Sequence, residues 1–174
     1  MSQHQIERLF EGSTDADATL TALMQALGEG ISCERCLLFL REPHSRKTRM
    51  THQWVLASER AIGRDDAGWI VESPSLPDED PMYREALTNP AALYIDDIET
   101  ANPDLVNAQF ERENFGHTAL VHAPIHHEGL MYGIIEPCVF TGPRVWSDDD
   151  RTLVALAQKR CVPVAIEYIA QHCV

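Results

Sequence analysis

The fold is decided by residues 102–167, which read NPDLVNAQFERENFGHTALVHAPIHHEGLMYGIIEPCVFTGPRVWSDDDRTLVALAQKRCVPVAIE. Two runs of strand-forming residues, 117–125 and 130–140, are joined by a short turn that contains glycine, as in a β-hairpin. Ser147 and Asp150 have the spacing of a capping box, which predicts a long helix from there to the C-terminus. The segment therefore predicts two paired strands followed by a helix.

Upstream of this segment the pattern predicts helices, a second hairpin and an irregular stretch. The expected elements are a short helix over 3–11, a helix capped by Ser13 or Asp15 and ended by Gly28 and Gly30, paired strands over 36–42 and 48–58, and a mostly irregular stretch over 59–81. The apolar residues of the second helix recur at helical spacing and form one stripe: Leu20, Leu23, Met24 and Leu27.

Short elements connect this part to the deciding segment. We expect a helix over Met82–Leu87 opened by Pro81, a strand over 92–98, and a further helix that starts at Asn102-Pro103. The long C-terminal helix should be kinked or broken at Pro163, since proline costs about 3 kcal/mol inside a regular helix. The element order predicts one α+β domain over residues 1–174. It would have a central antiparallel sheet, terminal helices on one face and loops with short helices over the other.

Composition excludes several classes of protein. The chain has 27 acidic against 14 basic residues and a net charge of −13, which argues against binding nucleic acid. No apolar run reaches the roughly 18 residues of a membrane-spanning helix, and the N-terminus has no secretory pattern. We therefore expect a cytoplasmic protein without membrane insertion, whose acidic surface gives solubility or meets a basic partner.

The five cysteines are expected to be reduced thiols, because they are odd in number and scattered. Cys33 and Cys36 have C-x-x-C spacing but lack a second pair, so no metal site is predicted.

Strand alternation collects polar residues on one face of the central hairpin. It places Tyr132, Glu136 and Cys138 together on the second strand and His122 on the facing side of the first. Buried ionisable groups need partners, so a cross-strand pair of His122 and Glu136 is expected.

Three interpretations of that face stay open. The polar groups line a small-molecule pocket, form an internal hydrogen-bonded cluster without a ligand, or act in catalysis with His122 as base and Cys138 as nucleophile. No oxyanion hole or third catalytic member is recognisable, so catalysis ranks last. His44, His52 and His117 occur singly and are interpreted as surface or hairpin residues.

The deciding segment resembles the second half of a GAF domain, and within that family the bilin-binding GAF domains of cyanobacteriochromes and phytochromes. The resemblance lies in the order of elements and in the exit Gly142-Pro143-Arg144-Val145-Trp146 before the closing helix. It covers the chain well after residue 92 and weakly before residue 80. It implies the GAF architecture and a cyanobacterial origin.

The chain departs from the bilin-binding pattern at the pigment attachment site. Where those relatives carry cysteine and histidine, this sequence has Asp104 and Leu105, and a carboxylate cannot form a thioether. Cys138 stands where the relatives have a further histidine, and Asp78, Glu79 and Asp80 match their acidic motif loosely. The resemblance also allows Trp69 and Ile70 to act as lid residues, although a surface loop anchored by one tryptophan is the preferred interpretation. The candidate pocket residues are His122, Tyr132, Glu136, Cys138, Asp104 and Trp69.

The expected function is that of a stand-alone, non-catalytic regulatory or protein-interaction module without a cofactor. It would form a homodimer through its terminal helices and bind an unidentified protein partner. The first alternative is a sensor that binds a bilin, another tetrapyrrole or a nucleotide non-covalently. The second is a thiol-dependent reductase similar to GAF-type methionine sulfoxide reductases, which would need two of Cys33, Cys36 and Cys138 to meet over the pocket.

Overall fold

The computed structural model describes residues 3–12, 15–63 and 68–173 and contains one six-stranded antiparallel sheet. The strands are β1 (Arg35–Glu42), β2 (Lys47–Val55), β3 (Ile70–Val71), β4 (Leu93–Ile95), β5 (Ala119–His127) and β6 (Leu130–Val139). Their order across the sheet is β3-β2-β1-β6-β5-β4, so the two hairpins predicted from sequence, β1–β2 and β5–β6, meet along β1 and β6.

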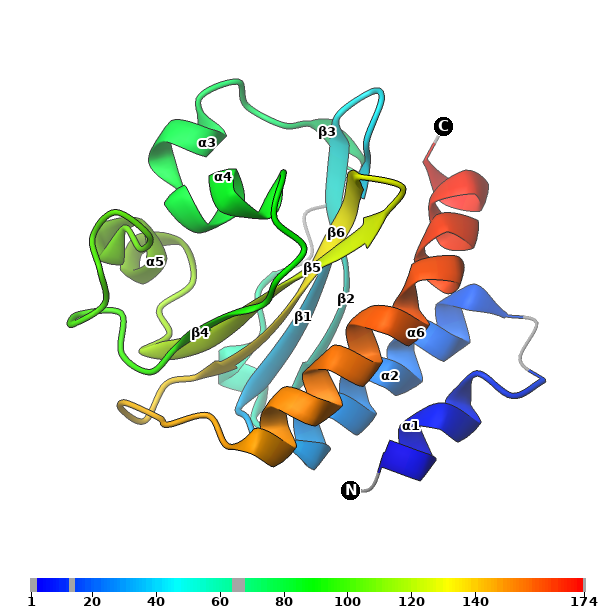
Figure 1. Ribbon diagram of the computed structural model, residues 1–174, viewed down its shortest axis with the longest axis horizontal. Helices are drawn as coiled ribbons and strands as arrows, with labels where there is room; N and C mark the ends of the chain where they lie inside the picture. The colour runs from blue at the N-terminus through cyan, green and yellow to red at the C-terminus, as the bar shows by residue number, and fades with distance from the viewer. Residues whose placement is uncertain (1–2, 13–14, 64–67, 174) are drawn as a thin grey trace.

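Helices cover both faces of the sheet (Figure 1). They are α1 (Gln3–Leu9), α2 (Ala16–Gly30), α3 (Leu76–Glu79), α4 (Pro81–Ala86), α5 (Ala108–Asn114) and α6 (Asp148–His172), with a 3₁₀ turn at Ser58–Arg60. The terminal helices α1, α2 and α6 pack together on one face, and the short helices α3, α4 and α5 lie over the other. The expected α+β architecture is confirmed.

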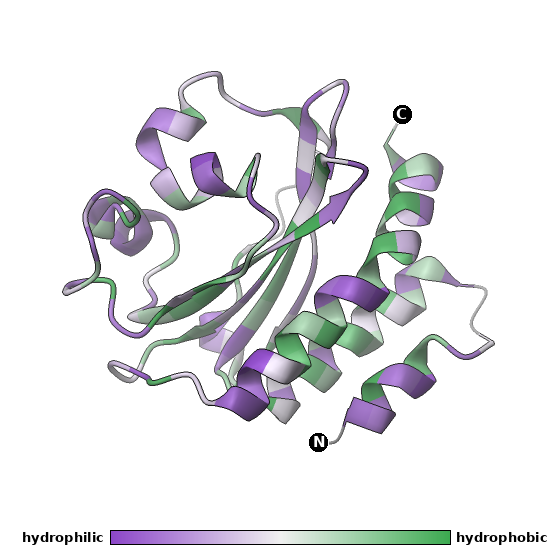
Figure 2. Cartoon of the chain, in the orientation of Figure 1, coloured by the Kyte–Doolittle hydropathy of each residue, from purple (hydrophilic) through white to green (hydrophobic). Residues whose placement is uncertain are grey.

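The main core lies between the sheet and the terminal helices. Figure 2 shows hydrophobic residues along the strands and on the helix sides that face them. The predicted stripe of α2 is fully buried there, and each such side chain stabilises the fold by roughly 1.5–3 kcal/mol. All three tryptophans, Trp54, Trp69 and Trp146, pack against this helix-side core. Trp146 also donates its indole N–H to the carbonyl of Ile95, 3.1 Å away.

Helix α2 begins where the sequence predicts and ends at Gly30. The carboxylate of Asp15 caps it by accepting from the Ala18 N–H, while Ser13 lies outside the described residues. Of the two glycines predicted to end the helix, Gly30 is its last residue, whereas Gly28 lies inside it. Gly28 is required for close packing instead, since a Cβ there would lie 2.2 Å from the ring of Trp54.

The turn between β5 and β6 and the start of α6 form as predicted. Glu128 and Gly129 both have positive φ, as a two-residue hairpin turn requires, and Ser147 with Asp150 closes the capping box of α6. Of the kink or break expected at Pro163, the break does not occur, because α6 runs through this proline as one helix. Figure 1 shows the axis of α6 changing direction between its first and last turns, as a kink requires. Pro163 is exposed, and a kink at proline arises from the clash of its ring with the carbonyl four residues earlier.

The helix expected from Pro103 also differs. Residues 103–105 form a turn, and α5 starts only at Ala108, because the side chain of Asn107 caps it by accepting from the Phe110 N–H. Leu105 and Val106 still pack inward, against the core on the cavity side of the sheet. The stretch over 59–81 is less irregular than expected, since it contains β3 and α3; its residues 64–67 lie outside the described part.

No helix within the described residues combines the length and the apolar character that crossing a bilayer demands.

Candidate functional site

A cavity of about 170 Å³ lies between the sheet and the short helices α3, α4 and α5. Its walls are mostly apolar, with the side chains of Phe39, Leu76, Phe110, Phe115, Met131 and Ile134. Six polar side chains also reach it: Arg41, Thr48, Asp80, Tyr83, His122 and Glu136. An apolar cavity with a few placed polar groups is the usual form of a small-molecule site.

The predicted pair of His122 and Glu136 is present on the cavity face. Nδ1 of His122 lies 3.3 Å from Oε2 of Glu136, across strands β5 and β6, and both side chains are almost fully buried. Burial alone would lower the pKa of His122, but the hydrogen bond to Glu136 and the charges of Glu136 and Asp80 raise it above its ordinary value. Burial likewise opposes ionisation of Glu136, and the bond from His122 holds its pKa below the usual range. The hydrogen bond and the opposite charges thus favour the ionised form of both groups.

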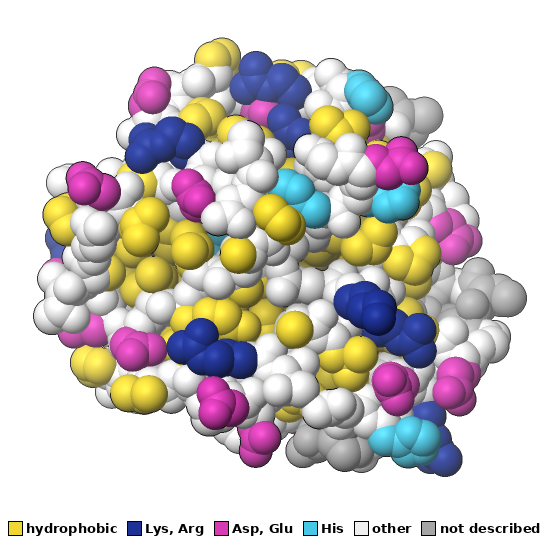
Figure 3. Space-filling view, in the orientation of Figure 1, with side chains coloured by type: hydrophobic (Ala, Val, Ile, Leu, Met, Phe, Trp, Pro, Cys, Tyr) yellow, Lys and Arg dark blue, Asp and Glu magenta, His cyan; other side chains and the backbone are white. Residues whose placement is uncertain are grey.

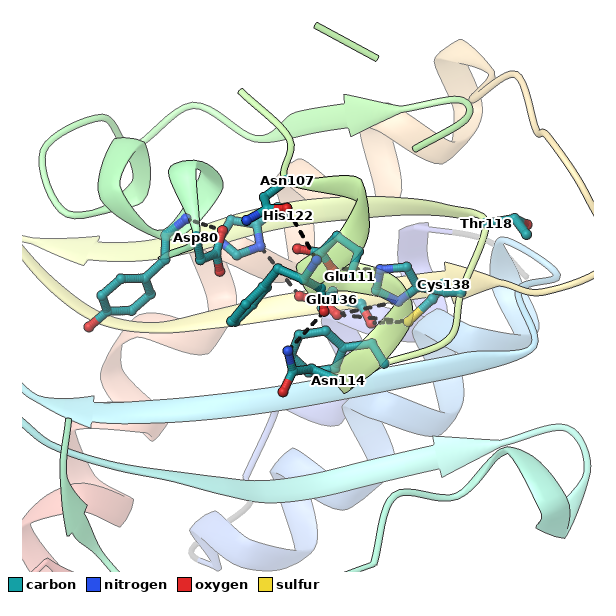
Figure 4. Close-up of polar contacts among 12 residues, drawn as sticks. Asp80, Asn107, Glu111, Asn114, Thr118, His122, Glu136 and Cys138 are labelled. Carbon is teal, nitrogen blue, oxygen red and sulfur yellow. Dashed lines mark hydrogen bonds and ion pairs between the residues drawn. The ribbon is translucent and has the colours of Figure 1, made fainter. Parts of the chain in front are cut away.

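One nitrogen of His122 remains without a partner. Its Nε2 is buried and makes no hydrogen bond with any described residue, although the side chain lines the cavity. Figure 4 shows Asp80 on the far side of this ring from Glu136. Asp80 caps α4 by accepting from the Tyr83 N–H, and burial raises the pKa of its carboxyl although His122 opposes that rise.

A second histidine extends the polar cluster away from the cavity. Nε2 of His117 lies 2.9 Å from Oε2 of Glu111, and its Nδ1 lies 3.9 Å from Oε1 of Glu136. Burial raises the pKa of Glu111 to about 9, together with the charges of Glu136 and Asp80, and burial lowers the pKa of His117 to about 4. Glu111 and His117 thus share one hydrogen bond inside the buried cluster, and Nδ1 of His117 is the ring nitrogen that faces Glu136.

A separate ion-pair network closes the other end of the cavity. Glu72 accepts two hydrogen bonds from Arg41 at 2.9 and 3.0 Å, one from Arg46 at 2.6 Å, and one from the hydroxyl of Tyr83. Arg41 and Tyr83 line the cavity, whereas Glu72 stands behind them. The guanidinium of Arg41 is thus already neutralised and offers no free charge to an anionic ligand.

The placement of Tyr132 on the cavity face is wrong. A β-bulge lies in the β5–β6 hairpin: Ile125 pairs with Gly133 and His126 pairs with Met131, so Tyr132 is the extra residue. The bulge reverses which face of the sheet each side chain takes in the part of β6 that precedes Gly133. Met131 therefore faces the cavity, and Tyr132 packs against the helix-side core.

Trp69 and Asp104 also lie away from the cavity. Trp69 packs against the helix-side core and Ile70 lines only a neighbouring surface groove, so the lid role is wrong for both. Asp104 is exposed in the turn before α5, with its N–H bonded to the side chain of Asn102, and it does not line the cavity.

Cys138 is buried on the cavity side of β6 but does not line the cavity, and neither does any other of the five cysteines, all of which are described. Cys33 and Cys36 belong to the helix-side core, so the convergence needed for a reductase is absent among these thiols. Burial raises the pKa of Cys33 to about 12 and those of Cys36 and Cys138 well above the ordinary value. Such thiols are poor nucleophiles at neutral pH.

Sequence reasoning missed several residues of this region. His117 and His52 are buried, not surface residues, and His52 contacts Asp17 of α2. Glu111 gives no signal in the sequence, because the helix expected from Asn102-Pro103 starts before the observed α5, which begins at Ala108. His117 lies two residues before the buried strand β5, and that position is the one signal available in the sequence.

Comparison with known proteins agrees with this architecture. The sequence profile of the GAF domain matches residues 15–160. The chain belongs to the GAF domain family. A search of curated proteins found no match.

Solved GAF domains share the fold at low sequence identity. The phycocyanobilin-bound GAF domain of a cyanobacterial phytochrome has a TM-score of 0.75 and 14% identity, over 99% of this chain and 98% of that one. The GAF domain of PixJ from Thermosynechococcus elongatus, in its blue-light-absorbing form, has a TM-score of 0.66 and 16% identity, over 91% and 90%. The GAF domain of a phosphoenolpyruvate-protein phosphotransferase from Acinetobacter has a TM-score of 0.69 and 12% identity, over 98% and 97%. These similarities establish the fold.

Proposed function

We propose that this GAF domain is a non-catalytic regulatory module that senses a small molecule held non-covalently in the cavity. The observation that carries the proposal is the free Nε2 of His122, which is buried and has no hydrogen-bond partner among the described residues, on the wall of a mostly apolar cavity. A buried polar group without a partner costs about 1–3 kcal/mol. A ligand oxygen that reached this nitrogen would recover that free energy.

The size of the cavity limits the ligand to about one ring. A protein cavity of about 150 Å³ is known to hold benzene, and the volume here is about 170 Å³. Phe39, Phe110 and Phe115 supply aromatic walls. The ligand class that fits is a single aromatic ring with one oxygen substituent, such as phenol or benzamide.

Larger ligands fit these walls less well. A bilin has four linked rings, and a nucleotide needs unpaired cations for its phosphates, whereas Arg41 is held by Glu72. One similar solved structure is a GAF domain with bound phycocyanobilin. It supports a ligand-binding role on this fold but does not identify the ligand here.

Binding can be tested by filling the cavity. Wild-type protein is titrated with phenol and benzamide by calorimetry, and its unfolding temperature is measured with each. Ile134 lines the cavity and is 5% exposed, so Ile134→Phe should abolish binding. Leu56→Phe, at a side chain that is 67% exposed, is the matched control and should bind like wild type. Equal binding by Ile134→Phe, or no binding of either compound by wild type, would refute the proposal.

The homodimer through the terminal helices stays a prediction. Apolar residues of the terminal helices, such as Leu20, Leu23 and Leu153, are buried inside the single chain. A dimer would therefore use the outer sides of α1, α2 and α6. Light scattering at high protein concentration decides this point, because a strictly monomeric mass excludes the dimer.

A protein partner of this GAF domain would meet an acidic surface. The net charge is −13, and on the face shown in Figure 3 the Lys and Arg side chains occur in separate groups among acidic ones. A basic partner surface is the complementary choice. Its binding should weaken as salt concentration rises.

A further inference from the structure

Three buried side chains with metal-binding atoms meet beside the cavity. They are His117, which precedes β5, and Glu136 and Cys138, which lie two residues apart on β6. Their ligand atoms all lie within 4.8 Å of one another. Nδ1 of His117 is 3.9 Å from Oε1 of Glu136, and Sγ of Cys138 is 4.0 Å from the same oxygen. Figure 4 shows Glu136 and Cys138 side by side in this cluster.

From this arrangement we infer that His117, Glu136 and Cys138 form a binding site for a single Zn²⁺ ion. Thiolate, imidazole and carboxylate are the three ligand types that zinc takes in proteins. Tetrahedral coordination at the usual bond lengths places ligand atoms roughly 3.3–3.7 Å apart. The separations of 3.9 and 4.0 Å therefore need to shorten by about half an ångström, and Nδ1 of His117 and Sγ of Cys138, which lie within 4.8 Å of each other, need to approach as well.

The hydrogen bonds around the three residues have the form of an outer coordination shell. A histidine that binds a metal through one nitrogen generally bonds a carboxylate through the other, and Nε2 of His117 already contacts Glu111. Glu136 is similarly held, because its second oxygen pairs with His122. Both ligands are thus oriented by partners that leave the metal-facing atoms free.

One atom of this cluster, a ring nitrogen of His117, has no hydrogen bond that would account for its burial. Nδ1 of His117 is buried and has no hydrogen-bond partner among the described residues. The thiol of Cys138, in contrast, donates to the backbone oxygen of Glu136 at 3.4 Å, so the cysteine alone does not require a metal. An ion between the three atoms satisfies Nδ1, the thiolate and the carboxylate together.

Charge is balanced at such a site. The thiolate of Cys138 and the carboxylate of Glu136 would neutralise Zn²⁺, which makes burial of the ion acceptable. The positive charge of Arg35 acts in favour of the thiolate, although burial opposes it. With three protein ligands, a fourth position stays open for water or another donor.

The test uses the full chain freed of metal by dialysis against a chelator. Zn²⁺ binding is measured by equilibrium dialysis with elemental analysis, and Co²⁺ serves as the spectroscopic substitute. We expect one Zn²⁺ per chain, a rise in unfolding temperature on addition of Zn²⁺, and a thiolate-to-cobalt charge-transfer band. Cys138→Ser and His117→Gln should each weaken binding at least tenfold, and Cys138→Ser should lose the charge-transfer band.

Cys161→Ser is the matched control, since Cys161 is also fully buried but lies on α6 outside the cluster. It should bind Zn²⁺ and Co²⁺ like wild type. If the cluster variants fail to fold, X-ray absorption of the wild-type Zn²⁺ complex decides, and it should show one sulfur ligand. Wild-type protein that binds no stoichiometric Zn²⁺, a site without sulfur, or a charge-transfer band that persists in Cys138→Ser would each overturn the inference.

The metal site goes beyond the proposed sensor function and does not depend on it. Ile134→Phe fills the cavity and should leave Zn²⁺ binding intact. Protein that binds Zn²⁺ but neither phenol nor benzamide would retain the metal site and exclude the sensor, whereas the reverse result would exclude the metal site alone.

Discussion

At the scale of single residues, Glu72 is the most connected carboxylate in the described chain. It is 4% exposed and accepts hydrogen bonds from Arg41, Arg46 and Tyr83. Two of these donors form part of the cavity wall. The shape of that wall therefore depends on a residue that does not itself line it.

Replacing Glu72 with glutamine should destabilise the protein by about 3–5 kcal/mol, because it leaves the buried guanidinium of Arg41 without its counter-ion. Urea unfolding measures the change. Glu99→Gln is the control, since Glu99 pairs with Arg112 at the surface where both side chains are about half exposed. That variant should lose no more than about 1 kcal/mol. Similar losses in both variants would contradict this interpretation.

Glu72 should also control stability in acid. Burial opposes its ionisation, but the bonds from Arg41, Tyr83 and Arg46 lower its pKa from 4.5 to about 2. A lowered pKa in the folded state gives stability that is present above pH 4.5 and is lost as pH falls towards 2.

Unfolding free energies at several pH values between these limits provide the measurement. Wild type should lose stability more steeply than Glu72→Gln, which lacks the titrating group. Parallel curves would show that Glu72 does not carry the effect.

At the scale of elements, α6 contains an unfavourable residue that it does not need for packing. Pro163 is exposed, lies inside the helix and cannot donate to the carbonyl of Lys159. Pro163→Ala should therefore stabilise the protein by about 1–2 kcal/mol, the helix penalty of about 3 being partly offset by greater freedom in the unfolded chain.

The expected rise in unfolding temperature from Pro163→Ala is about 2–8 °C for a chain of this size. Lys159→Ala, on the same exposed helix surface, should change it by about 1 °C or less. A fall in Pro163→Ala would mean that the proline shapes a contact of α6 beyond its own turn.

The alternation of side chains along a strand predicted β5 and β6 well, and it failed where one extra residue interrupts the alternation. The alternation along β5 placed His122 correctly, and the pairing with Glu136 followed. On β6 the same rule assigned Tyr132 to the wrong face, because the bulge before Gly133 adds one residue that has no signature in the sequence.

Helix starts depend on competition between caps that sequence alone does not rank. Pro103 offers a favourable first turn, but the side chain of Asn107 accepts from the Phe110 N–H and fixes the start of α5 there. Glu111 is carried to the buried cluster by this later start. The same uncertainty hid the contact between Glu111 and His117.

At the scale of the whole molecule, family resemblance predicted the fold and left the ligand open. The GAF architecture follows from the order of elements, whereas the cavity volume depends on side chains from seven separate strands and helices. Binding of a bilin, like the cyanobacterial origin, therefore stays a prediction that the family alone does not decide.

Protein produced together with a bilin-synthesis pathway should be colourless, since the cavity holds about one ring. The absorbance spectrum is recorded on native protein and again after denaturation in acidic urea. A visible band that remains with the denatured chain would require a covalent bond, with Cys138 as the first residue to examine. A band lost on denaturation would show that the short helices open to admit a tetrapyrrole.

The positions of the three tryptophans determine what intrinsic fluorescence reports. Trp54, Trp69 and Trp146 all belong to the helix-side core, and none of them lines the cavity. A ligand in the cavity therefore has no direct contact through which to quench their emission. A change in tryptophan emission on ligand addition would mean that the sheet had relayed the event to the terminal helices. Calorimetry thus measures whether the cavity holds a ligand, and the emission spectrum measures whether ligand binding changes the helix-side core.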